Sequence, residues 1–291
     1  QDHEVVISFS NKTDSGLTIS GRYDVDADTD GIDESSISIA GGFGTITLGA
    51  NDGVADAFGV TEQDLINDEP HLSKFSSYAS ASSTATIGIA TNAGETAASG
   101  DANKIAYITP SFGGFKAGYS MADAGVGTNT TNTTDMGFSY SFPLEGGSVL
   151  AEYNQSTKDG TASAAEFKST NYGVTLTMGA VSFIASTSTA EEATAGSNAL
   201  TEDIEANGFA VKYDLGGGLT IAASTMESED AIDKSGANKE KYSSNIGEVS
   251  YSIAPGLTAN ITYNDYDYKA GNTGNDADGG SITQLTVNAK F

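Results

Sequence analysis

Cysteine is absent from the 291-residue chain, so neither a disulfide nor a thiolate metal site can form. Basic residues are scarce, because 13 Lys and Arg stand against 39 Asp and Glu and give a net charge of −26. Proteins that bind nucleic acid present patches of Lys and Arg, so this balance argues against a nucleic-acid partner. The 2 histidines, His3 and His71, lie far apart and no Gly-x-Ser-x-Gly motif occurs, so we expect no enzymatic activity.

Long hydrophobic runs are missing as well. Hydrophobic residues make up 38% of the chain, below the average of roughly 45–50% for globular proteins. No run of about 18 apolar residues occurs, which excludes a transmembrane helix. No signal peptide is visible at Gln1, so a secreted protein would be present here in its processed form. A membrane β-barrel escapes this hydropathy test, because only every second residue of its strands faces lipid.

Alternation of apolar and polar residues is the main signal that is present. A period of two residues predicts strands with one apolar face and one face of Thr, Ser, Asn and charged residues. Near the C-terminus, the apolar residues are Leu257, Ala259, Ile261 and Tyr263, and the polar residues between them are Thr258, Asn260, Thr262 and Asn264. We expect about fifteen strands, over residues 4–10, 17–26, 36–41, 45–49, 104–109, 115–122, 135–142, 148–155, 166–178, 181–189, 203–213, 219–228, 242–253, 257–268 and 281–291.

The connections between these strands alternate between short and long. Short turns rich in Gly and Pro, such as 110–114, are followed by long polar loops, such as 123–134 and 229–241. A soluble sandwich has no reason to separate loop lengths in this way, whereas bacterial outer-membrane barrels have short periplasmic turns and long outer loops. Aromatic residues beside the short turns support the barrel, because they are placed as a membrane-interface girdle requires: Phe115, Phe142, Tyr213 and Phe291.

One connection is much longer than the rest and follows the strand that ends near Ala50. Loops of this length inside regular β-structure are rare, and they are usually functional or disordered. We predict that residues 51–102 fold into the mouth of the barrel and narrow it. The chain is then a single β-barrel domain over residues 1–291, with the constriction loop inside it.

Strand parity adds a further expectation. Single-chain bacterial barrels have even strand numbers, so fifteen strands leave one missing. An extra strand at 84–90 would invert every later strand and place the short turns outside, so we reject it. We predict instead an upward strand before Gln1, and sixteen strands in the intact protein.

Two segments resemble a known family. Residues 103–119 (NKIAYITPSFGGFKAGY) resemble the strand–turn–strand that follows the constriction loop of Gram-negative general diffusion porins, and residues 45–53 are similar to the strand that enters that loop. Phe291 is similar to the C-terminal aromatic residue of the family. The resemblance covers nearly the whole chain, is closest to the alphaproteobacterial sixteen-stranded type, and implies a homotrimer that passes small hydrophilic solutes. The family's first strand has no match here, and its arginine cluster is reduced to Arg22.

Alternation predicts which charged residues line the pore. Strand residues assigned to the lumen are Arg22, Asp24, Lys104 and Lys116, together with Lys212, Glu152 and Glu248. The acidic residues of the constriction loop expected to face them are Asp52, Asp56, Glu62, Asp64, Asp68 and Glu69. Rings of acidic side chains favour cations, so we expect a cation-preferring channel. The alternative is that the loop acids are solvated surface charge.

Carboxylates of the outer loops could also bind Ca²⁺, which takes six to eight oxygen ligands. The candidate ligands are Asp30, Asp33, Glu34, Asp276 and Asp278. None of these clusters matches an EF-hand or a repeated calcium motif, and the alternative is a plain acidic coat on the cell surface. No other cofactor is expected.

These patterns predict an all-β, transmembrane antiparallel barrel in the bacterial outer membrane, surrounded by the lipid bilayer and working as a porin. A second hypothesis is a barrel that acts mainly as a surface anchor or receptor through its acidic loops, with lipopolysaccharide or surface-layer components as partners. A third is a soluble acidic Ca²⁺-dependent adhesin or β-solenoid, but the fixed internal repeat of a solenoid is not seen.

Overall fold

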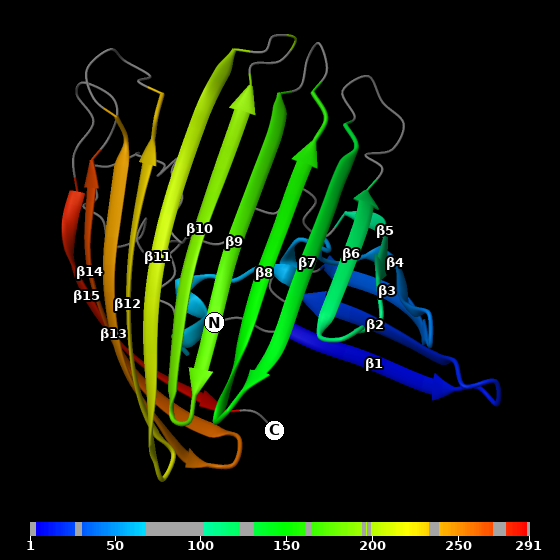
Figure 1. Cartoon of the computed structure of the whole chain (residues 1–291), viewed down its shortest axis with the longest axis horizontal. Coiled ribbons are helices and arrows are strands. Elements are labelled where there is room, and N and C mark those ends of the chain that lie inside the picture. Colours follow the sequence, from blue (N-terminus) through cyan, green and yellow to red (C-terminus); the bar gives the residue numbers. More distant parts are fainter. Residues whose placement is uncertain are drawn as a thin grey trace.

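The computed structural model describes residues 4–26, 31–67, 102–122, 131–160, 165–193, 196, 199–232, 239–269 and 278–289. Its fold is an antiparallel sheet of 15 strands, in which each strand pairs with its neighbours in the sequence (Figure 1). The strands are β1 (Glu4–Lys12), β2 (Thr18–Asp26), β3 (Gly31–Gly41), β4 (Gly44–Ala50), β5 (Asn103–Ile108), β6 (Phe115–Ala122), β7 (Thr133–Leu144), β8 (Gly147–Lys158), β9 (Glu166–Met178), β10 (Val181–Ala193), β11 (Leu200–Gly216), β12 (Leu219–Asp230), β13 (Lys241–Ala254), β14 (Leu257–Lys269) and β15 (Asp278–Ala289).

Helix is nearly absent from the described residues. Two short 3-10 helices, η1 (Asp56–Phe58) and η2 (Glu62–Leu65), follow β4. No helix in this part of the chain is long and apolar enough to cross a membrane.

The predicted strands all occur, in the predicted order, and several are longer than predicted. The strand expected over residues 203–213 is β11, which spans Leu200–Gly216. The turn expected at residues 143–147 is shorter, because Pro143 pairs with Ser148 and Leu144 with Gly147. The hairpin then closes over Glu145 and Gly146, where Gly146 has a φ of 80°, in the left-handed region that tight hairpins need.

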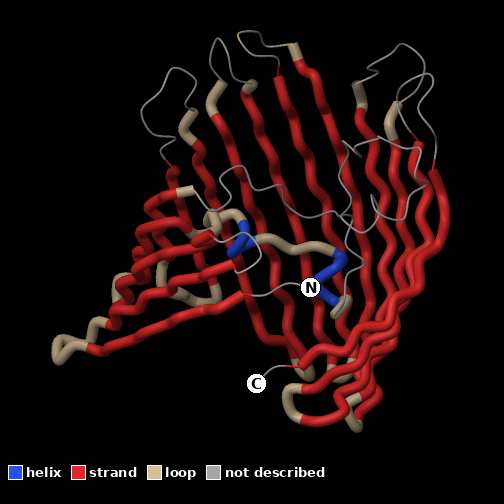
Figure 2. Tube along the Cα trace, turned by 180° about the vertical axis from the view of Figure 1, so that it is seen from behind, coloured by secondary structure: helices blue, strands red, loops and turns tan. Residues whose placement is uncertain are grey.

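Burial along the strands is the reverse of that in a soluble protein. In β14, the side chains of Asn260, Thr262 and Asn264 are buried, whereas Ile261 and Tyr263 are 53% and 47% exposed. The buried polar face is the concave one, because it carries the residues that contact the segment following β4, which lies inside the curve of the sheet (Figure 2). Soluble proteins bury their large apolar side chains, so this sheet presents its apolar face to lipid and its polar face to an interior passage.

Aromatic side chains form a row across the convex face of β6 to β9. The ring centroids of Phe115 and Phe138 are 6.1 Å apart, those of Phe138 and Tyr153 are 5.9 Å apart, and those of Tyr153 and Tyr172 are 5.1 Å apart. Such a row suits an interface between apolar chains and lipid headgroups, because aromatic rings are enriched there.

The predicted girdle residues lie on this convex face where the structure describes them. Phe115 and Tyr213 are 43% and 41% exposed. Phe142 is half-buried, with its ring centroid 5.7 Å from that of Tyr140. Phe291 lies outside the described residues.

The wall of the sheet is tall on one side and low on the other (Figure 1). Strands β7 to β14 have 12–17 residues, whereas β4, β5 and β6 have only 7, 6 and 8 residues. Within the described residues, β1 and β15 are the two ends of the strand order, and no pairing joins them. The sixteenth strand therefore stays a prediction.

Candidate functional site

The site is built by residues 51–67, which we call the constriction segment. It leaves β4 and crosses the inner face of the sheet, where η1 contacts β7 and β8 and η2 contacts β10, β11 and β12 (Figures 1 and 2). Residues 68–101, the rest of the predicted loop, lie outside the described part of the chain, and Asp68, Glu69 and His71 lie among them.

Hydrogen bonds attach the start of this segment to the wall. The backbone N–H of Val54 donates to the Ser120 hydroxyl at 2.9 Å, and that hydroxyl donates to a carboxylate oxygen of Asp135 at 2.8 Å. The Ser156 hydroxyl donates to the other Asp135 oxygen. Asp135 and Ser120 are buried, with exposures of 1% and 0%, so these bonds are shielded from competing water.

Two further attachments lie along the segment. The side-chain amide of Asn171 accepts from the N–H of Val60 at 3.2 Å and donates to its carbonyl at 3.1 Å. At the far end, the Asn67 side-chain amide donates to Glu248 at 2.7 Å, and its backbone N–H donates to the same carboxylate at 3.0 Å. Lys212 donates to the Asn67 side-chain oxygen at 2.9 Å. The segment is therefore held on β6, β9, β11 and β13.

Apolar side chains of the segment pack against the wall between these attachments. The contacts join Val54 and Phe58 to Ala106, Val60 to Ile184 and Ala210, and Ile66 to Ala222 and Ile246. Burying a side chain of this size contributes about 1.5–3 kcal/mol. The apolar side of the segment thus faces the wall, and its polar side is left for the passage.

Glycines on the concave face make room for these side chains. A Cβ added to Gly137 would lie 2.4 Å from the Phe58 ring, and one added to Gly173 would lie 2.3 Å from Val60. Gly118 and Gly208 are opposed in the same way by Val54 and Glu62. A glycine inside a strand often marks a place where another part of the chain approaches closely.

These glycines were not predicted to contact the loop, although the sequence carries a signal for them. Each glycine replaces a side chain on the lumenal face of an alternating strand, since the residues two positions away face the lumen. The buried Asp135 and Asn171 were overlooked too, because a polar residue on the lumenal face carries no sign that it binds a loop.

Acidic side chains line the passage side of the segment. Asp52, Asp56 and Asp64 are exposed there. Partial burial raises the pKa of Asp56, nearby Asp52 and Asp64 raise it further, and Lys104 lowers it. Partial burial also raises the pKa of Asp64, against the opposing effect of a 3.0 Å bond from the Thr61 N–H to its carboxylate.

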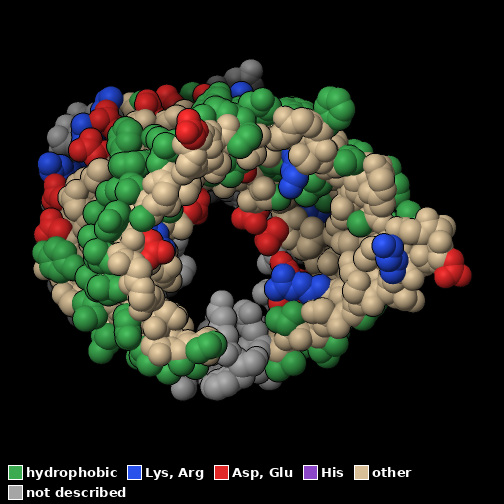
Figure 3. All heavy atoms as spheres, turned by 60° about the horizontal axis from the view of Figure 1, so that its bottom comes forward, with side chains coloured by type: hydrophobic (Ala, Val, Ile, Leu, Met, Phe, Trp, Pro, Cys, Tyr) green, Lys and Arg blue, Asp and Glu red, His purple; other side chains and the backbone are tan. Residues whose placement is uncertain are grey.

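Basic side chains lie on the wall around these acids. Arg22, whose side chain is 50% exposed, bonds Asp24 at 2.6 Å and Glu34 at 3.1 Å. Glu152 lies within electrostatic reach of both Asp64 and Lys116. Figure 3 looks from the side of the short turns into an opening bordered by acidic and basic side chains.

Four of the predicted pore residues are less open to the passage than expected. Glu248 is 4% exposed, because Asn67 of the constriction segment lies against it and donates to it. Glu62 is 1% exposed, because its side chain lies between the segment and the wall beside Gly208, where the Ser186 hydroxyl donates to it at 3.4 Å. Lys104 is 6% exposed and donates to the Asn51 carbonyl. Asp24 is 2% exposed beneath Arg22.

The predicted calcium ligands are largely beyond the described residues. Asp30 and Asp276 lie outside them, and the side chains of Asp33 and Asp278 are not described. Glu34 lies on the concave face of β3 and pairs with Arg22. Among the residues that are described, no group of three or more His, Asp or Glu side chains could hold a metal ion.

Comparison with known proteins agrees with this architecture. The model of the Gram-negative porin family matches residues 1–271. No curated protein matches the chain. An anion-selective porin from Comamonas acidovorans has a similar structure, with a TM-score of 0.67 and 16% identity over 98% of this chain and 87% of that one.

Two more solved structures share the fold. A porin refined at 1.8 Å has a TM-score of 0.63 and 18% identity over 99% of this chain and 92% of its own. OmpT, an outer membrane protein of Vibrio cholerae, has a TM-score of 0.65 and 11% identity over 98% of this chain and 89% of its own. The family match, the sheet and its inner segment lead to one conclusion: the chain belongs to the Gram-negative porin family and is a channel protein of the bacterial outer membrane.

Proposed function

We propose that the chain is a water-filled channel for passive diffusion of small hydrophilic solutes, that it prefers cations, and that it assembles as a homotrimer. The acidic passage side of the constriction segment carries the proposal of cation preference. Asp52, Asp56 and Asp64 project from a segment whose opposite side is packed against the wall. Their position is therefore fixed, and a permeating ion has to pass them.

The charges around the narrow part favour cations. The acidic residues described there are Asp24, Glu34, Asp52, Asp56, Glu62, Asp64, Asp135, Glu152 and Glu248, and the basic residues are Arg22, Lys104, Lys116 and Lys212. Burial removes Lys104 from the passage, and it removes five of the acids as well: Asp24, Glu34, Glu62, Asp135 and Glu248. The acids left open or partly open are Asp52, Asp56, Asp64 and Glu152, against Arg22, Lys116 and Lys212. Arg22 is paired with two acids, so the open charge still favours cations. One unit charge at about 4 Å is worth about 1 kcal/mol even in water, or about fivefold in local cation concentration.

The fold alone does not set this preference, since one structural relative is described as anion-selective. Fixed charge decides the sign, and low-dielectric walls focus its field on the passage. We therefore expect the preference to weaken as salt screens these charges.

Reversal potential in planar bilayers tests the proposal. Under a KCl gradient centred near 0.1 M, the sign of the potential should indicate cation preference. The preference should shrink near 1 M, because the Debye length falls from about 10 Å to about 3 Å. Neutralising Asp52, Asp56 and Asp64 together as Asn should reduce it, whereas Asp14→Asn in a short turn should leave it unchanged. Anion preference of the unaltered channel would overturn the proposed selectivity.

The low wall supports the trimer. A transmembrane strand needs about 9–11 residues, whereas β4, β5 and β6 have 7, 6 and 8. These strands are too short to face lipid across the whole membrane, so we expect other subunits to cover them. Mass measurement of the native protein in mild detergent should give three chains per particle, and a monomeric mass would contradict this.

A further inference from the structure

A small hollow of the inner wall lies where the constriction segment leaves β4. It has a volume of about 200 Å³, and we call it the niche. One side is formed by residues 51–54, 56 and 57 of the segment, and the other side by the concave face of β4 and β5. The strand residues that line it are Thr45, Thr47, Ala106 and Ile108. The niche is therefore a recess between the segment and the wall.

The niche lies on the short-turn side of the narrow part. Thr45 pairs with Ile108, and this pair ends the ladder of β4 and β5 next to the short turns. The segment begins at the other end of β4, so the niche extends from the turns up to the segment. Asp52 and Asp56 line the niche and are also exposed, which joins it to the passage.

The polar groups of the niche are mainly hydrogen-bond acceptors. The carboxylates of Asp52 and Asp56 can only accept when ionised. The Thr47 hydroxyl shares a 2.8 Å hydrogen bond with that of Ser38. The Nδ2 of Asn51 donates to the Asp52 carbonyl at 2.8 Å, and its Oδ1 is buried without a partner. Because an unpaired buried acceptor costs free energy, the niche favours a ligand rich in donors.

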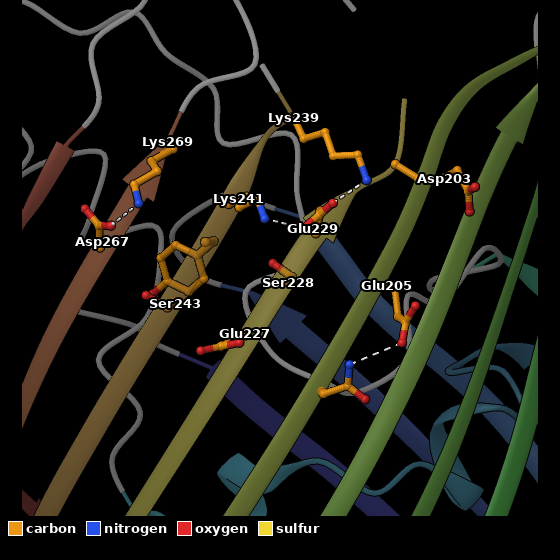
Figure 4. Close-up of a pocket in the computed structure, with 13 residues that line it drawn as sticks. Asp203, Glu205, Glu227, Ser228, Glu229, Lys239, Lys241, Ser243, Asp267 and Lys269 are labelled. Carbon is orange, nitrogen blue, oxygen red and sulfur yellow. Dashed lines mark hydrogen bonds and ion pairs between the residues drawn. The ribbon is translucent and has the colours of Figure 1, made fainter. Parts of the chain in front are cut away.

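Neither carboxylate of the niche is neutralised by a pairing partner. Among the described residues, Asp52 and Asp56 form no ion pair. The acids at the loop end of β12 to β14 differ in this respect, because their ion pairs are Glu229 with Lys239 and Lys241, and Asp267 with Lys269 (Figure 4). The niche therefore keeps two carboxylates available to a ligand.

The basic side chains nearest to the niche are engaged elsewhere. Arg22 is within electrostatic reach of Asp52, but it already binds two acids on its own side of the passage. Lys104 is within electrostatic reach of Asp56, but it is buried and donates to the Asn51 carbonyl. Within the described part of the chain, no basic residue lines the niche itself. Its charge is therefore negative.

Apolar side chains complete the niche. Val54 and Ala106 are buried against each other, whereas Ile108 is half-buried and Ala57 is exposed. Ile108 and Ala57 thus offer apolar surface that a hydrated metal ion cannot use. The described residues also contain no group of three His, Asp or Glu side chains able to hold a metal. An organic cation fits these surroundings better than a metal ion does.

We propose that the niche binds a primary ammonium group that carries a short aliphatic chain, so that small amines are a preferred class of solute. The ammonium group has three N–H donors, which would bind Asp52 and Asp56, and the chain would lie on Ile108 and Ala57. The carboxylates would repel an anion, and they would leave the acceptor oxygens of a sugar unpaired. The inference rests on the proposed cation-preferring channel and names a solute class for it.

Block of the potassium current tests this site. In planar bilayers at constant ionic strength, n-butylammonium should reduce the K⁺ current saturably. It should do so at lower concentration than tetramethylammonium, which has the same charge but no N–H donor. The half-blocking concentration should fall by up to about fourfold for each methylene added between methylammonium and n-butylammonium, because each one buries apolar surface. Neutral n-butanol should not block.

Substitutions separate the niche from the rest of the constriction segment. Asp52→Asn combined with Asp56→Asn should raise the half-blocking concentration of n-butylammonium by about tenfold or more. Asp64→Asn is the matched control, because it removes a charge from the same segment outside the niche, and it should change this concentration far less. Ile108→Ser should abolish the dependence on chain length. A stable open channel in KCl shows that each variant has folded.

Failure of this site can be distinguished from failure of the proposed selectivity, because the reversal potential in KCl involves no amine. In a cation-preferring channel, equal block by n-butylammonium and tetramethylammonium would overturn the ammonium site. Equal half-blocking concentrations in the Asp52 and Asp56 double variant and in Asp64→Asn would overturn it as well. Anion preference in KCl would instead overturn the selectivity, and the preference for amines with it.

Discussion

Alanine at Gly173 should push the constriction segment off the wall. The new Cβ would lie 2.3 Å from both Cβ and Cγ1 of Val60, whereas carbon atoms in contact lie about 3.5–4.0 Å apart, so Val60 must move by about 1.5 Å. The segment cannot yield by turning one side chain, because Cβ is fixed to the backbone. The backbone of Val60 is held by Asn171, whose side-chain amide accepts from the Val60 N–H at 3.2 Å and donates to the Val60 carbonyl at 3.1 Å.

The energetic cost and its consequence follow from this contact. Overpacking of a well-packed site costs about 1–3 kcal/mol. Part of this cost can be relieved only by moving the segment toward the passage. We therefore expect a smaller single-channel conductance and slower entry of larger sugars in liposome swelling. Gly247→Ala is the matched control, because nothing lies within 4 Å of its added Cβ.

A compensating substitution sharpens the test. Val60→Gly removes both the Cβ and the Cγ atoms that oppose the new methyl group, so the double variant Gly173→Ala with Val60→Gly should recover part of the lost conductance. The double-mutant cycle should then show coupling between the two positions. If Gly173→Ala folds and conducts as the unaltered chain does, the segment does not pack against β9 as described.

Three further predictions concern charge and lipid contact. The pKa values of Asp56 and Asp64 are raised. As the pH falls, these carboxylates therefore become protonated and lose their charge at a higher pH than an ordinary Asp, whose pKa is about 3.9. Cation preference should therefore fall on mild acidification. A cation-to-anion permeability ratio that stays constant down to pH 4 would contradict this. Glu248→Gln removes the charge that binds Asn67 at 2.7 and 3.0 Å, so the attachment of the segment should weaken by about 1–3 kcal/mol. Fluctuations of the single-channel current should then increase. An unchanged level of current fluctuation would show that this bond does not hold the segment. Val211→Arg places a charge on the lipid face. It should lower the free energy of unfolding from vesicles by up to about 2–4 kcal/mol, depending on the depth of the residue in the membrane. An unchanged free energy of unfolding would show that Val211 does not face lipid.

Alternation was sufficient to predict the strands within the membrane, because lipid on one side and water on the other enforce a period of two. It failed where the strands rise above the apolar band. Residues 190–193, 200–202, 229, 230 and 241 were expected in loops but belong to strands. On β12, for example, Glu227 and Glu229 on the outer face flank Ser228 on the inner face, so both faces are polar and the signal disappears.

The constriction segment could be located from the sequence, but its orientation could not. Alternation does not operate in an irregular segment, so nothing in the sequence distinguishes Glu62, which is buried against the wall, from Asp64, which is exposed. Burial of Glu62 depends on the space left by Gly208 on a strand far along the chain. Such long-range complementarity becomes visible only when the register of the sheet is known.

Access of water to the two faces of the sheet is the most direct test of the architecture. Because the chain lacks cysteine, single cysteines can be placed at Arg22 and Lys212 on the concave face, and at their neighbours Tyr23 and Val211 on the convex face. A charged, membrane-impermeant thiol reagent should modify the first pair and lower the current, and it should leave the second pair unmodified in a bilayer. Modification of Tyr23→Cys and Val211→Cys, with Arg22→Cys and Lys212→Cys protected, would contradict a water-filled passage lined by the polar faces.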